Sequence, residues 1–387
     1  MLLAHTAAAL PEMLERLRAW VEWESPSQEP ERVRGLARAV AAAFEAADCR
    51  ATFHADALEL DCPGTRDAVD APILLLGHLD TVYPAGTLRT MPFAIVGEGE
   101  AGRTEVGGAA GRAYGPGIFD MKAGVVQALY ALQALRASPR TTRHSPITLL
   151  LVYDEEIGSP RSRRLSEPAM QAARAVLVLE PAADTDGKLK TARKGTARYR
   201  LTAHGVPAHA GLDFARGASA IVELARRVVE VAGWSALERG VTVNPGVIAG
   251  GTGSNVVAEE AHAEVEARAW TAAEQHALDA RFRSLAAADA RVRLEVTGGI
   301  SRPPMETSPA SDALRARVQN VAAGLGFALG ATRVGGASDG NLAAALGRPT
   351  LDGLGAVGAG AHTSEEHILV AHLAPRAALL AALLAEL

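Results

Sequence analysis

Acidic and histidine side chains recur along this sequence, several of them directly after apolar runs. The series is His78, Asp80, Asp120, Glu155, Glu156, Glu180 and His362. Histidine combined with carboxylates, and without thiolates, suits zinc, cobalt or manganese in a hydrolytic site. Two such ions about 3.5–4 Å apart need one bridging carboxylate and further ligands on each side, which two histidines and three acids can supply. The series therefore predicts a centre for two divalent metal ions.

The apolar runs that precede these residues predict the elements that position them. Ile73–Leu76 leads to His78, Ile147–Tyr153 leads to Glu155, and Ala175–Leu179 leads to Glu180. Continuous apolar runs are typical of strands buried on both faces of a parallel sheet. In open α/β sheets, sites lie beyond the carboxyl ends of such strands. The spacing of apolar residues further predicts helices at 11–22, 31–47, 120–135 and 162–173, and one strand at 51–60.

The pattern changes near position 190. Strands are expected at 196–204, 241–249, 261–270 and 292–297, with helices at 217–231 and 272–288. This β-α-β-β-α-β order is the ferredoxin-like arrangement. We therefore expect an α/β protein with two domains. A discontinuous domain comprises residues 1–190 and 301–387, and residues 191–300 form an inserted α+β domain.

Composition and charge exclude several classes of protein. The net charge is −5 without a basic stripe, so nucleic-acid binding has no electrostatic support. No run of 18 apolar residues predicts a membrane span, and the N-terminal residues lack a secretory signature, so a cytoplasmic location is expected. No glycine-rich fingerprint opens a βαβ unit, which disfavours a redox or nucleotide enzyme.

The two cysteines, Cys49 and Cys62, exclude both a disulfide framework and a thiolate zinc cluster. We expect two free thiols, with a single disulfide between them as the alternative.

Five stretches stand out along nearly the whole chain: Gly77–Val82, Gly115–Lys122, Asp154–Ser159, Glu180-Pro181 and Gly360–Thr363. Together, and in this order, they resemble the two-zinc aminoacylase and glutamate carboxypeptidase family, whose relatives include acetylornithine deacetylase and succinyl-diaminopimelate desuccinylase. The resemblance implies a zinc-exopeptidase-like mixed sheet flanked by helices, with an inserted ferredoxin-like lid that forms a homodimer.

The resemblance implies a role for each member of the metal centre. His78 and Glu180 match the ligands of one ion, and Glu156 and His362 match those of the other. Asp120 matches the carboxylate that bridges them. The ions are expected to be zinc, with cobalt or manganese as alternatives.

Neighbouring residues match supporting roles. Asp80 resembles the carboxylate that orients His78 through its other ring nitrogen. Glu155 resembles the general base, which takes a proton from the water bridging the metals and passes it to the leaving amine. Glu365 and Glu366 are expected to cap the helix that follows them.

The inserted domain carries three candidates for substrate contact. His209, within Gly205–Gly211, resembles the lid histidine that stabilises the oxyanion, often across a dimer. Asn255 resembles a substrate-binding asparagine. Arg268 matches the residue that holds the substrate's α-carboxylate, which a guanidinium can bind with two parallel hydrogen bonds. A histidine in a loop or an arginine on a strand can also be an ordinary surface residue, and that alternative stays open.

The function that follows is hydrolysis of a small peptide or N-acyl amino acid. The leading prediction is a zinc-dependent, glutamate carboxypeptidase-like enzyme that cleaves an amide bond adjacent to a free α-carboxylate. The alternatives are an N-acyl-amino-acid deacylase and a non-catalytic metal-binding relative. Met121 leaves the choice between carboxypeptidase and deacylase open, because many carboxypeptidase relatives carry Asp at this position whereas deacylases commonly carry Met.

Overall fold

The computed structural model describes residues 1–64, 71–97, 111–138 and 144–387. These residues divide into two compact units. The first unit comprises 1–191, 307–334 and 338–387, and the second comprises 192–306 and 335–337. The second boundary lies beyond the expected position 300 because the last strand of the second unit continues to Arg302.

The main sheet of the first unit has the strand order β1-β2-β6-β3-β7-β14. Strands β6, β3, β7 and β14 are parallel to one another, and β1 and β2 run antiparallel at one edge. The strands are β1 (Arg50–Phe53), β2 (Ala57–Cys62), β3 (Ile73–His78), β6 (Ile147–Val152), β7 (Ala175–Val178) and β14 (Thr350–Leu351). A smaller antiparallel sheet contains β4 (Ala94–Gly97), β5 (Gly111–Tyr114), β15 (Gly358–Ala359) and β16 (His367–Leu369), and β8 (Leu189–Arg193) pairs with β13 (Ala331–Val334).

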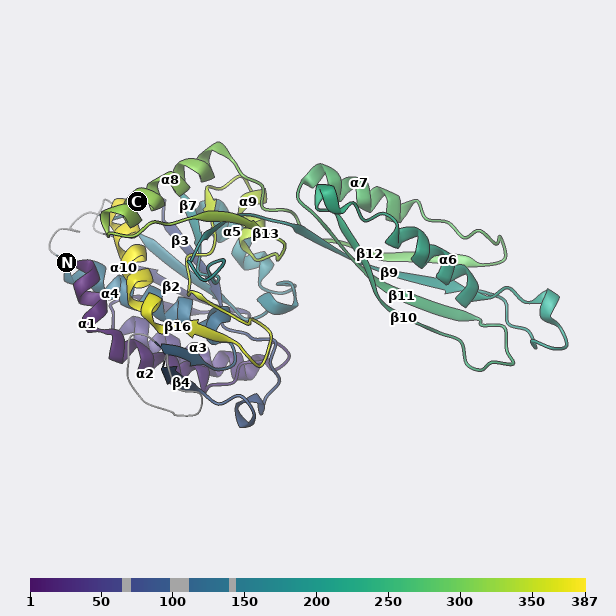
Figure 1. Cartoon of the computed structure of the whole chain (residues 1–387), viewed down its shortest axis with the longest axis horizontal. Coiled ribbons are helices and arrows are strands. Elements are labelled where there is room, and N and C mark those ends of the chain that lie inside the picture. The colour runs from purple at the N-terminus through teal and green to yellow at the C-terminus, as the bar shows by residue number, and fades with distance from the viewer. Residues whose placement is uncertain (65–70, 98–110, 139–143) are drawn as a thin grey trace. The chain divides into compact units, whose positions relative to one another are not determined.

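Helices cover both faces of the main sheet, because successive side chains of its buried strands point to opposite sides. Leu75, Leu149 and Leu177 join one core, shared with α2, α3, α4, α8 and α10. Leu74 and Leu150 join another, shared with α5 and α9. Figure 1 shows these layers. The helices of this unit are α1 (Leu2–Ala8), α2 (Leu10–Val21), α3 (Pro30–Glu45), α4 (Ala123–Ala137), α5 (Arg163–Ala172), α8 (Pro309–Gly324), α9 (Gly340–Ala345) and α10 (Val370–Glu386).

The second unit is an antiparallel sheet in the order β10-β11-β9-β12, with α6 and α7 along one face (Figure 1). Numbered along the chain, these are the second, third, first and fourth strands of the unit, which is the strand order of the ferredoxin-like arrangement. The helices pack on alternate, apolar residues of β9, including Tyr199 and Leu201. The elements are β9 (Gly195–His204), α6 (Ala220–Ala232), β10 (Thr242–Gly250), β11 (Glu260–Ala269), α7 (Ala272–Arg283) and β12 (Arg293–Arg302).

Within the described part of the chain, no helix combines the length and the apolar character that crossing a bilayer requires.

The single strand expected at 51–60 is wrong, because the chain reverses there to form the hairpin of β1 and β2. The backbone N–H of His54 donates to the carbonyl of Ala57 at the turn. The expectation of free thiols is also wrong. Cys49 and Cys62 flank the paired residues Arg50 and Asp61 and are joined by a disulfide. The bond therefore closes the open end of the hairpin at the edge of the main sheet.

The disulfide predicts a measurable contribution to stability. Its cysteines are 13 residues apart. Closing a loop of roughly this length is worth about 3 kcal/mol in the chain-entropy model. Reduction should therefore lower the free energy of unfolding by about 2–3 kcal/mol in denaturant titrations. A variant with serine at both positions should show the lowered value and no response to reductant. Two reactive thiols in the unfolded, unreduced protein would contradict the disulfide.

Candidate metal centre

Most of the predicted site residues lie at the carboxyl ends of the parallel strands of the first unit. His78 is the last residue of β3. Glu155 and Glu156 lie in a short 3₁₀ turn, Glu155–Ile157, directly after β6. Glu180 follows the end of β7 by two residues. Because these strands are parallel neighbours, their carboxyl ends share one edge of the sheet, and the side chains meet there.

Asp120 and His362 are brought to the same edge by loops. Asp120 lies in the irregular helical turn Ile118–Lys122, with non-helical backbone angles and a cis peptide bond to Met121. Gly117 opens this turn with a φ of +69°, a conformation that glycine adopts without strain. His362 lies between β15 and β16 and has a φ of +64°, which is uncommon for a residue with a side chain.

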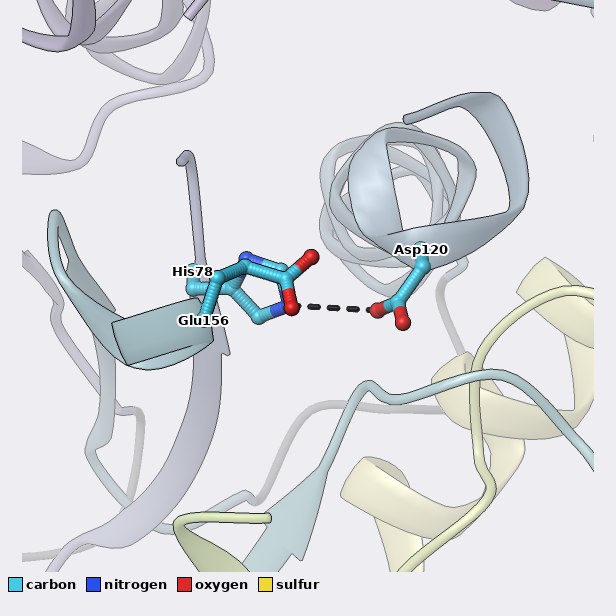
Figure 2. Close-up of side chains that lie close together, drawn as sticks. All are labelled: His78, Asp120 and Glu156. Atoms are coloured by element: carbon cyan, nitrogen blue, oxygen red, sulfur yellow. Dashed lines mark hydrogen bonds and ion pairs between the residues drawn. The ribbon is translucent and has the colours of Figure 1, made fainter. Parts of the chain in front are cut away.

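The carboxylate of Asp120 lies between two imidazoles. Its Oδ1 is 3.2 Å from Nε2 of His78, and its Oδ2 is 3.4 Å from Nε2 of His362. Each imidazole faces a second carboxylate. His78 Nε2 is 3.6 Å from Glu180 Oε1, and His362 Nε2 is 3.2 Å from Glu156 Oε2. Figure 2 shows His78, Asp120 and Glu156 converging from β3 and two separate turns. The structure thus arranges two imidazole–carboxylate pairs around the shared carboxylate of Asp120.

These donor groups fit divalent metal ions. Ligand atoms of His78, Asp120 and Glu156 all lie within 4.8 Å of one another, and so do those of His78, Glu155 and Glu180. Imidazole nitrogen and carboxylate oxygen are the donors that suit zinc in hydrolytic sites. The two sides differ in access, since the His78 side chain is 1% exposed and that of His362 is 49% exposed. The His78 imidazole is therefore enclosed by the protein, whereas the His362 imidazole is accessible to solvent.

The charged groups of the cluster shift one another's pKa values. Hydrogen bonds to Asp120 and Glu156 raise the pKa of His362 to about 10. Burial works against protonation of His78, but hydrogen bonds to Asp120, Asp80 and Glu180 outweigh it and raise its pKa. Burial likewise opposes ionisation of Asp120, yet the two imidazoles lower its pKa. Positive charge, from protons or from metal ions, is what stabilises this group of carboxylates.

Asp80 contacts His78 in a different way from the one expected. Nδ1 of His78 hydrogen-bonds the backbone carbonyl of Asp80 at 2.9 Å, and the carboxylate is farther away at 3.5 Å. The carboxylate instead accepts from the backbone N–H groups of Glu155 and Glu156, each at 3.1 Å, and from the Ser27 hydroxyl at 2.6 Å. Asp80 therefore fixes the ring of His78 with its main chain and the Glu155–Glu156 turn with its side chain.

Sequence reasoning missed Ser27 and misassigned Glu366. The predicted helix cap is wrong, because α10 begins at Val370 and no described side chain caps it. Glu366 is fully buried and accepts hydrogen bonds from the turn that carries Asp120. A glutamate four residues after His362 was the available signal, but the N–H groups that donate to Glu366 are more than 240 residues away in sequence.

The other candidates lie in the second unit. His209 is exposed, and its Nδ1 accepts from the backbone N–H groups of Gly211 and Leu212 at 3.1 and 3.2 Å. An accepting Nδ1 carries no proton, so a neutral ring has its proton on Nε2, available for donation. The carbonyl of Asn255 accepts from Ala210 N–H, which holds the Asn255 segment beside that of His209.

Arg268 is engaged within the second unit. Its Nε contacts Glu266 Oε1 at 2.7 Å, and its Nη1 donates to the carbonyl of Gly335 at 2.9 Å. These contacts set the direction of the guanidinium at the end of β11.

Comparison with known proteins assigns the chain to a family. The profile of peptidase family M20/M25/M40 matches residues 74–386. Carboxypeptidase G2 of Pseudomonas sp. strain RS-16 is 29% identical over 80% of this chain and 72% of its own length. Probable carboxypeptidases of Arthroderma and Trichophyton align over about half of their own length.

Solved structures share the fold. A tripeptidase of Staphylococcus aureus superposes with a TM-score of 0.76 at 20% identity, covering 98% of this chain and 99% of that one. The YXEP protein of Bacillus subtilis, a dinuclear metal-binding peptidase, superposes with a TM-score of 0.70 at 13% identity, covering 98% of both chains. The chain described here belongs to peptidase family M20/M25/M40 and is a metal-dependent hydrolase.

Proposed function

We propose that this hydrolase uses two metal ions to cleave a peptide or N-acyl amide bond adjacent to a free α-carboxylate, as a glutamate carboxypeptidase does. The observation that carries the proposal is the Asp120 carboxylate, whose two oxygens face two different imidazoles. In this assignment, His78 and Glu180 would hold one ion, Glu156 and His362 would hold the other, and Asp120 would contribute to both. Bound divalent ions, zinc first and cobalt or manganese as alternatives, would lower the pKa of water toward about 7 and polarise the scissile carbonyl.

Glu155 is the proposed general base. It is 7% exposed, its backbone N–H donates to Asp80, and its carboxylate lies within 4.8 Å of potential ligand atoms of His78 and Glu180. Glu155 takes a proton from the attacking water and delivers it to the nitrogen of the leaving amine as the carbon–nitrogen bond breaks. His209 is the proposed donor to the oxyanion, because its accepting Nδ1 leaves the proton on Nε2.

Arg268 and Asn255 are the proposed contacts to the substrate. The carboxylate of a small substrate is the natural partner of a guanidinium. The similarity to Carboxypeptidase G2 favours an α-carboxylate next to the scissile bond. An N-acyl-amino-acid deacylase remains the second candidate, because the residue after Asp120 is Met121.

Substrate kinetics on chelated and metal-loaded protein test the proposal. A chelator should abolish hydrolysis, and added zinc or cobalt should restore it. The reloaded enzyme should show a higher kcat/KM for benzoyl-glutamate and folyl-glutamate than for acetylated amino acids. The reverse preference would assign the enzyme to the deacylases. Equal hydrolysis by metal-free and metal-loaded protein would refute a metal-dependent mechanism.

The adjacent glutamates provide a matched pair of variants. Glu155→Ala should keep both metal ions but lose roughly 10²–10⁴-fold in kcat, the usual contribution of a general base. Glu156→Ala should instead lose metal from the His362 side of the centre. Metal content by elemental analysis, measured beside kcat, separates the two effects. Full turnover by Glu155→Ala would remove Glu155 from the mechanism.

We further propose that the second unit is a lid that joins two copies of the chain. Val222 and Val229 are 51% and 75% exposed on α6, and with Ala225 and Ala232 they form one exposed helix face. The neighbouring β10 is an edge strand of the sheet, with exposed Val247. Unpaired strand edges and exposed apolar rows are features that association covers. A twofold interface would pair each feature with its own copy.

A charge on α6 tests the dimer. Val229→Glu should convert a dimer into a monomer in sedimentation experiments, because each interface would bury two carboxylates. If His209 acts in the partner's site, this monomer should also lose turnover while it keeps its metal. Phe53→Glu is the matched control, since Phe53 is 53% exposed but lies on β1 of the first unit. A wild-type protein that sediments as a monomer would refute the proposal.

The cytoplasmic location also stays a prediction. The Cys49–Cys62 disulfide counts against it, because cytosolic reductants keep most protein thiols reduced.

A further inference from the structure

Glu366 is a buried carboxylate whose hydrogen bonds all lead toward the metal centre. Its Oε1 accepts from the backbone N–H groups of Phe119 and Asp120, at 2.8 and 3.0 Å. Its Oε2 accepts from the N–H of Gly117 at 3.2 Å. One side chain therefore holds the backbone of the whole turn from which the Asp120 carboxylate projects.

Tyr83 supplies a further hydrogen bond to the same carboxylate. Its hydroxyl is 2.5 Å from Oε2 of Glu366, and 2.9 Å from the carbonyl of Thr363. Tyr83 lies five residues after His78, and Thr363 directly follows His362. Glu366 thus connects the three chain segments that carry His78, Asp120 and His362.

The geometry excludes a role for Glu366 as a metal ligand. A carboxylate offers about four acceptor positions, two on each oxygen. Phe119 and Asp120 occupy those of Oε1, and Gly117 and Tyr83 occupy those of Oε2. Both oxygens are therefore saturated by donors of the chain, so what remains for this side chain is to hold other groups in place.

We propose that Glu366 is a positioning residue, which fixes Asp120 relative to the segments of His78 and His362 so that the ligands are in place before metal binds. The inference deepens the proposed function and rests on its metal centre. Partners of metal ligands in other sites commonly contribute 10–100-fold to metal affinity. Here the partner acts through the backbone of the shared ligand, so both ions should depend on it.

Glu366→Gln tests the proposal with almost no change in shape. The amide nitrogen is itself a donor, and in either orientation it meets two donors of the chain. Competition with a chelator, using Co²⁺ as the probe, should show a loss of about 10–100-fold in affinity for both ions. The visible absorption spectrum of bound Co²⁺ should also change, because it reports ligand geometry. Glu365→Gln is the matched control, since Glu365 is exposed, and it should bind Co²⁺ like the wild type.

Tyr83→Phe is the second variant, because it removes one hydrogen bond and leaves the three from the backbone. It should weaken Co²⁺ binding in the same direction by a smaller factor, whereas Tyr130→Phe, at a buried tyrosine of α4, should not. Unfolding of each variant in the presence of chelator separates metal affinity from general stability.

Two outcomes would overturn the inference. One is wild-type affinity and spectrum in folded Glu366→Gln, and the other, decisive if that variant does not fold, is wild-type affinity in Tyr83→Phe. Failure of the proposed function looks different, because the wild-type protein would then bind no pair of ions or hydrolyse substrate without them.

Discussion

The concentration of negative charge at one edge of the main sheet is the constraint on which the rest of this site depends. Two like charges 4 Å apart repel by about 4 kcal/mol at an effective dielectric constant of 20. Two kinds of contact offset this repulsion. Asp80 and Glu366 are satisfied by backbone N–H groups and hydroxyls of the protein itself. Asp120, by contrast, faces two imidazoles, whose protons bound metal ions would displace.

This division explains why carboxylates so close together have separate roles. A carboxylate whose acceptor positions are occupied by N–H groups of the chain holds those groups and cannot readily bind a cation. A carboxylate that faces only an imidazole retains acceptor positions for an ion. Asp80 and Asp120 illustrate the contrast, since both carboxylates lie beside His78, that of Asp80 at 3.5 Å from Nδ1 and that of Asp120 at 3.2 Å from Nε2. Their hydrogen bonds, more than their location, distinguish a supporting residue from a ligand.

Local patterns in the sequence predicted strands β3, β6 and β7 and the acids and histidine at their ends. Asp120 and His362 lie in loops, and their proposed roles follow from the family resemblance. An apolar run followed by an acid or histidine requires no knowledge of distant residues. The hairpin of β1 and β2 lacked such a pattern, so a single strand was predicted in its place. That error led to a second one, the prediction of free thiols. Along a single extended strand, Cys49 and Cys62 would lie about 40 Å apart, which precludes a disulfide. Ser27 was missed and Glu366 was misassigned for a related reason, since their hydrogen-bond partners come from remote segments.

The division of the first unit along the sequence has a consequence for how the protein is made. Residues 192–306, which form most of the second unit, are synthesised between the segments that carry Asp120 and His362. During synthesis, the segments that carry Asp120 and Glu156 are therefore made well before those that supply His362 and Glu366. The inserted unit has its own core and can fold in the interval, as domains generally do. The proposed centre can therefore be completed only when the last segment of the first unit, which supplies His362 and Glu366, has been added.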